Sequence, residues 1–169
     1  VDAILLYALG LIAEDARARR YLEDYVNRSI EDDVLRAVAV MGLGLQRATD
    51  SFDTLTRALT DKDVRVRRSA AIALGQLDYK SAYREEWDEL EASIMRDGGE
   101  AASDRVIGEL ESYRARLRVK LDADEERLAA LREKAIDQIA GEALDDGDVM
   151  VRNFALISLG ELGGERALA

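Results

Sequence analysis

The feature that most constrains the fold is a 17-residue stretch that occurs twice without a gap. Residues 61–77 (DKDVRVRRSAAIALGQL) superpose on residues 146–162 (DGDVMVRNFALISLGEL). The aspartates, the Val-x-Val-Arg run and the Leu-Gly-x-Leu run coincide. A looser copy covers residues 32–45, and the end of another lies in residues 1–10. Such self-similarity predicts a repeat architecture in which each unit is stable only against its neighbours.

The Leu-Gly marks give the period of the repeat. They fall at Gly10, Gly44, Gly75 and Gly160, which are separated by 34, 31 and 85 residues. The first two spacings match one helix pair per repeat. The third predicts that extra sequence was inserted, or that a repeat has decayed, between Gly75 and Gly160.

Each copy predicts the second helix of a pair. Asp63 and Asp148 stand where a carboxylate caps a helix N-terminus and meets its dipole. A narrow apolar stripe follows, formed by Val66, Ala70, Ala73 and Leu77. Gly75 is expected to relax the last turn of this helix. Amphipathic first helices are expected around residues 19–26 and 52–59.

Composition favours an all-α class. Proline, the strongest helix breaker, is absent, and aromatic residues make up only 5% of the chain. Strands favour aromatic and β-branched residues, so a sheet is disfavoured. Glycine is therefore the main residue expected to end or interrupt helices in this sequence.

The repeated segments resemble HEAT repeats, and in particular the short variety of phycobilisome lyase-like proteins with the motif D-x-x-V-R-x-x-A-A-x-A-L-G. The resemblance is strongest at 61–77 and 146–162, weaker at 32–45 and partial at 1–10. It implies an all-α superhelix, a solenoid whose second helices line the concave face. We expect such a solenoid here, with an inserted helical hairpin.

The resemblance also assigns a structural ladder to the aspartate and arginine of the motif. These residues are Asp32 and Arg36, Asp63 and Arg67, and Asp148 and Arg152. Their spacing permits an i,i+4 ion pair worth only about 0.2–0.5 kcal/mol, whereas the family pattern implies contacts that run between repeats. In the first unit Asp2 occupies the arginine position, so the ladder is expected to end or change there.

Residues 78–145 carry the extra length and predict a helical hairpin. Two apolar stripes flank a turn at 97–99, one with Tyr79, Tyr83, Trp87, Leu90 and Ile94, the other with Val106, Leu110, Tyr113, Leu117 and Leu121. A third run, from Leu128 to Ala143, is expected to be the first helix of the final repeat. The predicted division is 1–77, 78–122 and 123–169. Alternatively, Ile107-Gly108 is a worn Leu-Gly mark of a decayed repeat.

A candidate binding surface lies on the second helices. Projection at about 100° per residue places Tyr7, Met41, Ile72 and Ile157 at one outward position, with Val38 and Phe154 beside it. The functional interpretation is a groove for an apolar peptide or helix. The alternative is that the hairpin, or repeats outside this sequence, cover the row.

Three other clusters have plainer interpretations. Residues 79–87 could supply an aromatic anchor, but such a stripe is more often core. The acidic run 145–148 lacks the ligand pattern of an EF-hand, which predicts a turn and a cap and no metal. Arg65, Arg67 and Arg68 are expected to balance nearby carboxylates.

Charge and missing residue types narrow the function. A net charge of -11 with a pI near 4.6 opposes binding to nucleic acid and to anionic membranes. Without cysteine or histidine the chain lacks thiolates and the commonest general base. Carboxylate pairs are abundant, yet nothing in the sequence places one in a closed pocket. No cofactor and no enzymatic activity are expected.

We therefore expect a scaffold that binds a partner protein or peptide. Two alternatives stay open: a regulatory or non-catalytic segment of a larger enzyme, such as a chromophore lyase-like protein, and a purely structural spacer. The first residue is valine and the last ones resemble the start of a helix, so the sequence is expected to be an excerpt. Cellular location is left open.

Overall fold

The computed structural model describes residues 2–12, 15–28, 32–97 and 104–163, and these residues form helices without strands. The helices are α1 (Ala3–Gly10), α2 (Ala16–Asn27), α3 (Asp33–Leu45), η1 (Thr49–Ser51), α4 (Phe52–Ala58), α5 (Val64–Gln76), α6 (Tyr83–Asp97), α7 (Asp104–Gln138), η2 (Ile139–Ala143) and α8 (Val149–Glu161). They divide into two compact units. We call residues 1–78 with 132–169 the solenoid unit, and residues 79–131 the hairpin unit.

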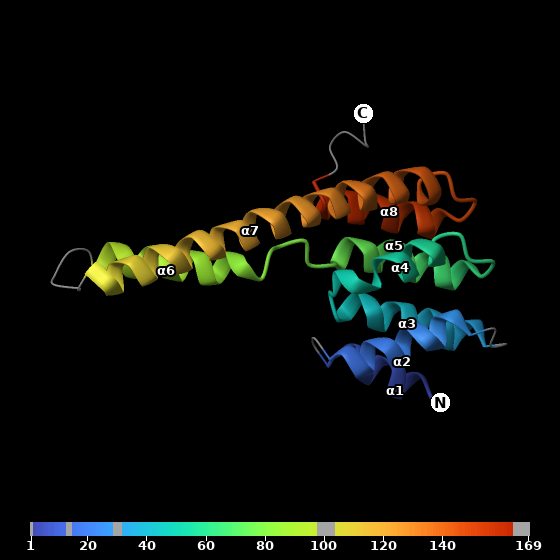
Figure 1. Ribbon diagram of the computed structural model, residues 1–169. Helices are drawn as coiled ribbons and strands as arrows, with labels where there is room; N and C mark the ends of the chain where they lie inside the picture. The colour runs from blue at the N-terminus through green and yellow to red at the C-terminus, as the bar shows by residue number, and fades with distance from the viewer. Residues whose placement is uncertain (1, 13–14, 29–31, 98–103, 164–169) are drawn as a thin grey trace. The chain divides into compact units, whose positions relative to one another are not determined.

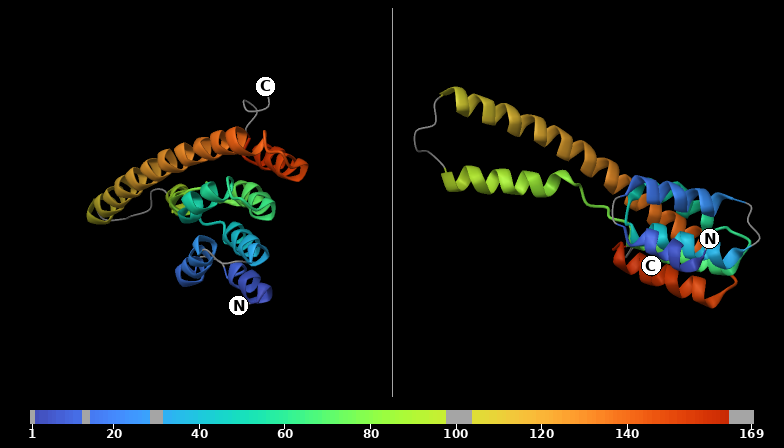
Figure 2. Two further views of the ribbon diagram at one scale, coloured as in Figure 1. Left: turned by 90° about the vertical axis from the view of Figure 1, so that its right-hand side faces the viewer. Right: turned by 90° about the horizontal axis from the view of Figure 1, so that it is seen from below.

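The solenoid unit consists of two layers of helices. Helices α1, α3, α5 and α8 lie side by side in one layer, in chain order (Figure 1, Figure 2). We call these the B helices. The A helices α2 and α4 form the other layer (Figure 2), and η2 packs against α5 and α8. This arrangement confirms the expected all-α superhelix.

Aspartates fix the starts of the helices in the solenoid unit. Asp63 Oδ1 accepts a hydrogen bond from the amide of Arg65 at 2.9 Å, and Asp148 Oδ1 accepts from the amides of Met150 and Val151. The same cap is present at α1, α2 and α3, formed by Asp2, Asp15 and Asp32. Such a cap stabilises a helix by about 0.5–2 kcal/mol, so five helix starts are set locally by the sequence.

The apolar stripe predicted for α5 is the core of the unit. Val66, Ala70, Ala73 and Leu77 are all buried. The largest fully buried side chains around them come from both layers, and include Leu6, Leu22, Leu43, Leu55, Leu59, Leu74 and Leu159. Burying side chains of this size contributes about 1.5–3 kcal/mol each. The apolar side chains of each helix pair are therefore buried by the neighbouring pairs on which it stacks.

Three glycines of the Leu-Gly marks make close contacts between helices. Helix α5 runs to Gln76, so Gly75 lies in its last turn. A Cβ atom built on Gly75 would stand 2.5 Å from Ser158 Oγ, and one on Gly44 would stand 2.7 Å from the Cβ of Ala73. Real Cβ atoms do not approach so closely. These glycines let consecutive B helices touch.

The residue that faces each such glycine is small and always at the same place in the repeat. Gly10 meets Gly42, just as Gly44 meets Ala73 and Gly75 meets Ser158. The facing residues Gly42, Ala73 and Ser158 superpose when the repeats are aligned on their Leu-Gly marks. Each repeat thus carries both a glycine that contacts the next B helix and a small residue that contacts the glycine of the previous one.

Polar side chains join the helices of the hairpin unit. Ser81 Oγ donates to Asp124 at 2.6 Å, Arg114 Nε donates to Glu91 at 2.6 Å, and Tyr113 pairs with Glu86. The order of these partners makes α6 and α7 antiparallel. Leu117, Leu121 and Leu128 are the buried leucines of α7.

Helix α7 is continuous from Asp104 to Gln138, so the second hairpin helix and the start of the last A helix form one element. The predicted turn at 97–99 falls largely outside the described residues, and the division 1–77, 78–122 and 123–169 stays a prediction. A Cβ at Gly108 would meet nothing within 4 Å, unlike one at Gly75. Gly108 therefore makes no close helix contact of the kind that Gly75 makes, and the insertion stays a prediction. Within the described residues, no helix is long and apolar enough to cross a membrane.

The glycine contacts give the first prediction. Gly75→Ala should lower the free energy of unfolding by about 1–3 kcal/mol, because the added methyl group overpacks against Oγ, Cβ and Cα of Ser158. Gly160→Ala is the matched control at the same repeat position, where a Cβ meets nothing within 4 Å. It should be neutral or stabilising by up to about 1 kcal/mol. Urea unfolding measures both, and equal effects of the two substitutions would contradict the role given to Gly75.

Candidate binding surface

Four apolar side chains lie at equivalent positions on the four B helices. Tyr7, Met41 and Ile157 are 44%, 39% and 57% exposed, and Ile72 is half-buried. Val38 and Phe154, one turn toward the N-terminus of their helices, are also half-buried. We call Tyr7, Met41, Ile72 and Ile157 the B-helix row.

The repeat places this row away from the core. At about 100° per residue, Ile72 lies on the side of α5 opposite Val66, Ala70 and Leu77, which are buried. The lateral sides of the helix are used for stacking, since Ala73 contacts α3 and Gly75 contacts α8. Only the outward arc is left for side chains that do not hold the solenoid together.

Ion pairs border the row on α5, toward the N-terminus of the helix. Arg65 forms two hydrogen bonds to the carboxylate of Asp63, at 2.9 and 2.8 Å. Arg68 reaches the next B helix and binds Asp148 at 2.9 and 2.6 Å. The hydrogen bond from Arg65 lowers the pKa of Asp63 to about 2, and Arg68 likewise lowers the pKa of Asp148. The apolar row therefore has a charged but internally paired border.

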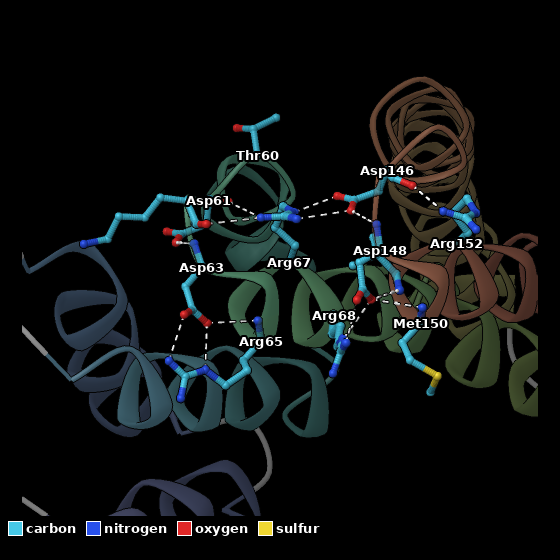
Figure 3. A network of polar contacts seen from close by, with 12 residues as sticks. Thr60, Asp61, Asp63, Arg65, Arg67, Arg68, Asp146, Asp148, Met150 and Arg152 are labelled. Atoms are coloured by element: carbon cyan, nitrogen blue, oxygen red, sulfur yellow. Dashed lines mark hydrogen bonds and ion pairs between the residues drawn. The ribbon is translucent and has the colours of Figure 1, made fainter.

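A second line of ion pairs joins consecutive repeats (Figure 3). Arg67 Nε donates to Asp146 Oδ2 at 2.6 Å and its Nη2 donates to Oδ1 at 3.1 Å. Arg36 Nη2 pairs with Asp61, and Arg36 Nη1 donates to Asp33 Oδ1 at 2.8 Å. These arginines are the ones predicted for the ladder, and each reaches the repeat that follows its own.

The carboxylates that receive these arginines differ from the motif aspartates. Asp32, Asp63 and Asp148 cap their own helices and do not pair with the arginine four residues later. The receiving residues are Asp61 and Asp146, two positions before the cap. The capping carboxylates of Asp63 and Asp148 bind Arg65 and Arg68 instead of the arginine four residues later.

In each Asp-x-Asp segment the first aspartate thus receives an arginine of the preceding repeat, and the second caps its own helix. In the last repeat, Asp146 Oδ1 accepts from the amide of Asp148 at 2.8 Å, and its carbonyl accepts from Arg152 Nη1 at 2.7 Å. The hydrogen bonds from Arg67 lower the pKa of Asp146. The coincidence of Asp61 with Asp146 was visible in the gapless superposition, and it is the signal by which these two residues could have been found.

The remaining sequence candidates contact other side chains of the protein. Arg65, Arg67 and Arg68 all pair with aspartates, as expected. Trp87 is half-buried, with the guanidinium groups of Arg114 and Arg118 at 5.8 and 5.2 Å from its ring centre. Within the acidic run 145–148, two of the three carboxylates are bound by arginines. In the part of the chain that the structure describes, no group of acidic residues could hold a metal ion.

One pocket was not foreseen. It lies between α1 and α2 and has a volume of about 500 Å³. Its lining is mostly apolar, with Leu5, Leu9, Ile12, Ala18 and Tyr21, and with Asp15 and Arg17 at its polar part. The pocket lies at the α1 end of the layered unit, where no earlier helix pair covers these side chains among the described residues.

Comparison with known families identifies the repeats. Residues 26–97 match the family model described as HEAT repeats. This part of the chain is therefore similar to HEAT repeats. The match begins at the end of α2, spans α3, η1, α4 and α5, and runs to the end of α6 in the hairpin unit. A search of curated proteins gives no match, and the phycobilisome lyase subtype stays a prediction. HEAT repeats commonly serve as protein-interaction scaffolds and are generally not enzymes.

The inter-repeat pair of Arg67 and Asp146 gives the second prediction. Asp146→Asn should lower the free energy of unfolding by about 1.5–3 kcal/mol, because a charge-assisted, largely buried double hydrogen bond is lost. Asp122→Asn is the control, since its pair with Arg118 is half exposed on both sides. It should cost less than about 1 kcal/mol. Denaturant titration compares the two variants, and a smaller loss for Asp146→Asn than for Asp122→Asn would refute the ladder as a stabilising element.

The third prediction concerns pH. The pKa values of Asp63, Asp146 and Asp148 are lowered in the folded state. The contribution of these carboxylates to the stability of the folded state is therefore complete above their pKa in the unfolded chain, about 4. It is lost as the pH falls through their lower pKa values in the folded state. The gap in unfolding free energy between wild type and Asp146→Asn should narrow from pH 7 to pH 2.5. A gap that stays constant over this range would contradict the assignment.

Proposed function

We propose that the solenoid unit binds a partner protein through the B-helix row. The observation that carries this proposal is the exposure of Tyr7, Met41 and Ile157, three large apolar side chains at one repeat position. Aromatic and methionine side chains are enriched in the cores of protein interfaces. The paired charges around Arg65 and Arg68 would form a polar rim around such a core.

The geometry of the repeat narrows the kind of partner. Packed helices are about 8–10 Å apart, so successive members of the row are separated by roughly that distance. A helix rises 1.5 Å per residue, and residues seven apart on one face are therefore about 10 Å apart. We propose an amphipathic helix that crosses the B helices and presents apolar residues at a spacing of seven.

The state of the carboxylates argues against a catalytic role for this surface. Asp63, Asp146 and Asp148 are bound by arginines and have lowered pKa values. A general acid needs a raised pKa in a site that excludes water. An interaction surface is therefore favoured over an acid–base site among these residues.

The fourth prediction tests the row. Met41→Asp combined with Ile72→Asp should weaken binding of captured partners at least tenfold, because two charges would be buried in an apolar contact. Ala16→Asp combined with Thr60→Asp adds the same charge at exposed positions around the A helices and should bind as wild type does. Affinity capture with each protein as bait, followed by quantitative mass spectrometry, compares the three.

Ile72 is half-buried, so the folding of the variants is checked by circular dichroism, and Tyr7→Asp provides a second variant at an exposed position. Equal recovery of partners by the wild type and by both row variants would contradict the proposal and leave the structural-spacer interpretation. A tetrapyrrole absorbance band in the purified chain would instead favour the chromophore lyase-like alternative.

A further inference from the structure

The capping aspartates of three B helices differ in whether an arginine neutralises them. Arg65 binds Asp63 from two residues further along the same helix, and Arg68 binds Asp148 from the preceding B helix (Figure 3). Asp32 caps α3 in the same way and is exposed, with its Oδ1 bound by two backbone amides at 3.0 and 3.1 Å. Among the described residues, no cationic side chain forms an ion pair with Asp32.

The repeat explains why this carboxylate is not neutralised. When the repeats are aligned on their Leu-Gly marks, the position of Arg65 is taken by Val34 on α3, and the position of Arg68 is taken by Ala3 on α1. Neither side chain carries a charge or a hydrogen-bond donor. The two positions from which arginines reach the other caps therefore offer no cation to Asp32.

The apolar side chains beside Asp32 are exposed members or neighbours of the B-helix row. Val34 is 47% exposed, and Tyr7 and Met41 of the row are 44% and 39% exposed. Val34 and Met41 are seven residues apart and lie on the same side of α3. An exposed carboxylate without a cation partner therefore borders the part of the row that α1 and α3 supply.

The charge of Asp32 acts at the border of the row. The hydrogen bonds that Arg65 donates to Asp63 raise the pKa of Arg65, and the nearby charges of Asp33 and Asp32 add to this rise. The side chain of Arg65 nevertheless directs its two hydrogen bonds to Asp63. The net charge of -11 also favours cations over anions as ligands of this chain.

From this arrangement we infer that Asp32 binds a lysine or arginine of the partner helix, beside the apolar contacts with Tyr7 and Met41. The inference rests on the proposed function and specifies the partner further, as a basic amphipathic helix. Oδ1 of Asp32 already accepts two amides, so Oδ2 is the atom that would receive the ammonium or guanidinium group. A metal ion is not favoured, because within the described residues no group of acidic side chains could hold one.

Such an ion pair would set the direction and register of the partner more than its affinity. The row by itself recurs on all four B helices and would accept an apolar helix in either direction. The unpaired carboxylate is present only on the side of α3, whereas Asp63 and Asp148 are already bound by arginines. A cation on the partner therefore distinguishes the α3 end of the row from the α8 end.

A display library of helical peptides tests this inference on the whole chain. Its members carry leucines seven residues apart, and the positions beside them are randomised between lysine, glutamate and glutamine. The library is selected on the wild type, on Asp32→Asn and on Asp15→Asn. Asparagine caps a helix as well as aspartate does. Asp15 caps α2 through two amides, just as Asp32 caps α3, so Asp15→Asn is the matched control for the loss of one charge.

Peptides enriched on the wild type should carry lysine at one of the randomised positions. Synthetic copies that differ only by lysine or glutamate there should differ about tenfold in Kd on the wild type and on Asp15→Asn, and less than about twofold on Asp32→Asn. Asp32→Ser, which also keeps a capping oxygen, should behave as Asp32→Asn does. Circular dichroism checks that the variants are folded.

A lysine preference that persists in Asp32→Asn would overturn the inference. The absence of any lysine preference, among peptides that no longer bind when Met41→Asp and Ile72→Asp are combined, would overturn it as well and leave the proposed function standing. Failure of the proposed function gives a different result, since the enriched peptides would then bind that double variant as tightly as they bind the wild type. The inference would fall with it.

Discussion

The close approach of consecutive B helices is the contact on which the rest of the solenoid unit depends. Gly75 and Ser158 lie so near each other that a single methyl group does not fit between them. At this distance the apolar stripes of neighbouring helices bury each other fully, and the ladder arginines can span from one repeat to the next. A larger residue at the glycine position would separate the helices and weaken both kinds of contact.

The Asp-x-Asp segment couples local and long-range order. One carboxylate, such as Asp148, satisfies the amide groups at the start of its own helix. The other, such as Asp146, holds an arginine of the preceding repeat and the amide of the capping residue. A helix start and an inter-repeat contact thus form together, as expected for a solenoid whose stability resides in neighbour contacts.

The B-helix row lies on the side of the B helices that is not used for packing within the solenoid unit. Two sides of α3 and of α5 contact neighbouring B helices and one faces the core, so side chains such as Met41 and Ile72 lie on the outward arc. The helices of the hairpin unit are joined by other kinds of contact. Its helices are linked by Arg114, Tyr113 and Ser81, and by cations over Trp87.

Sequence alone determined the class, the repeat, the helix starts and the buried stripe, because these depend on periodicity and on side chains that act within one helix turn. It did not determine the roles of Gly75, Asp61 and Asp146, which act on residues 25 to 83 positions away. A spacing pattern records that such residues recur. Which neighbour each one meets is decided only when the helices stack, because the partner lies on another element.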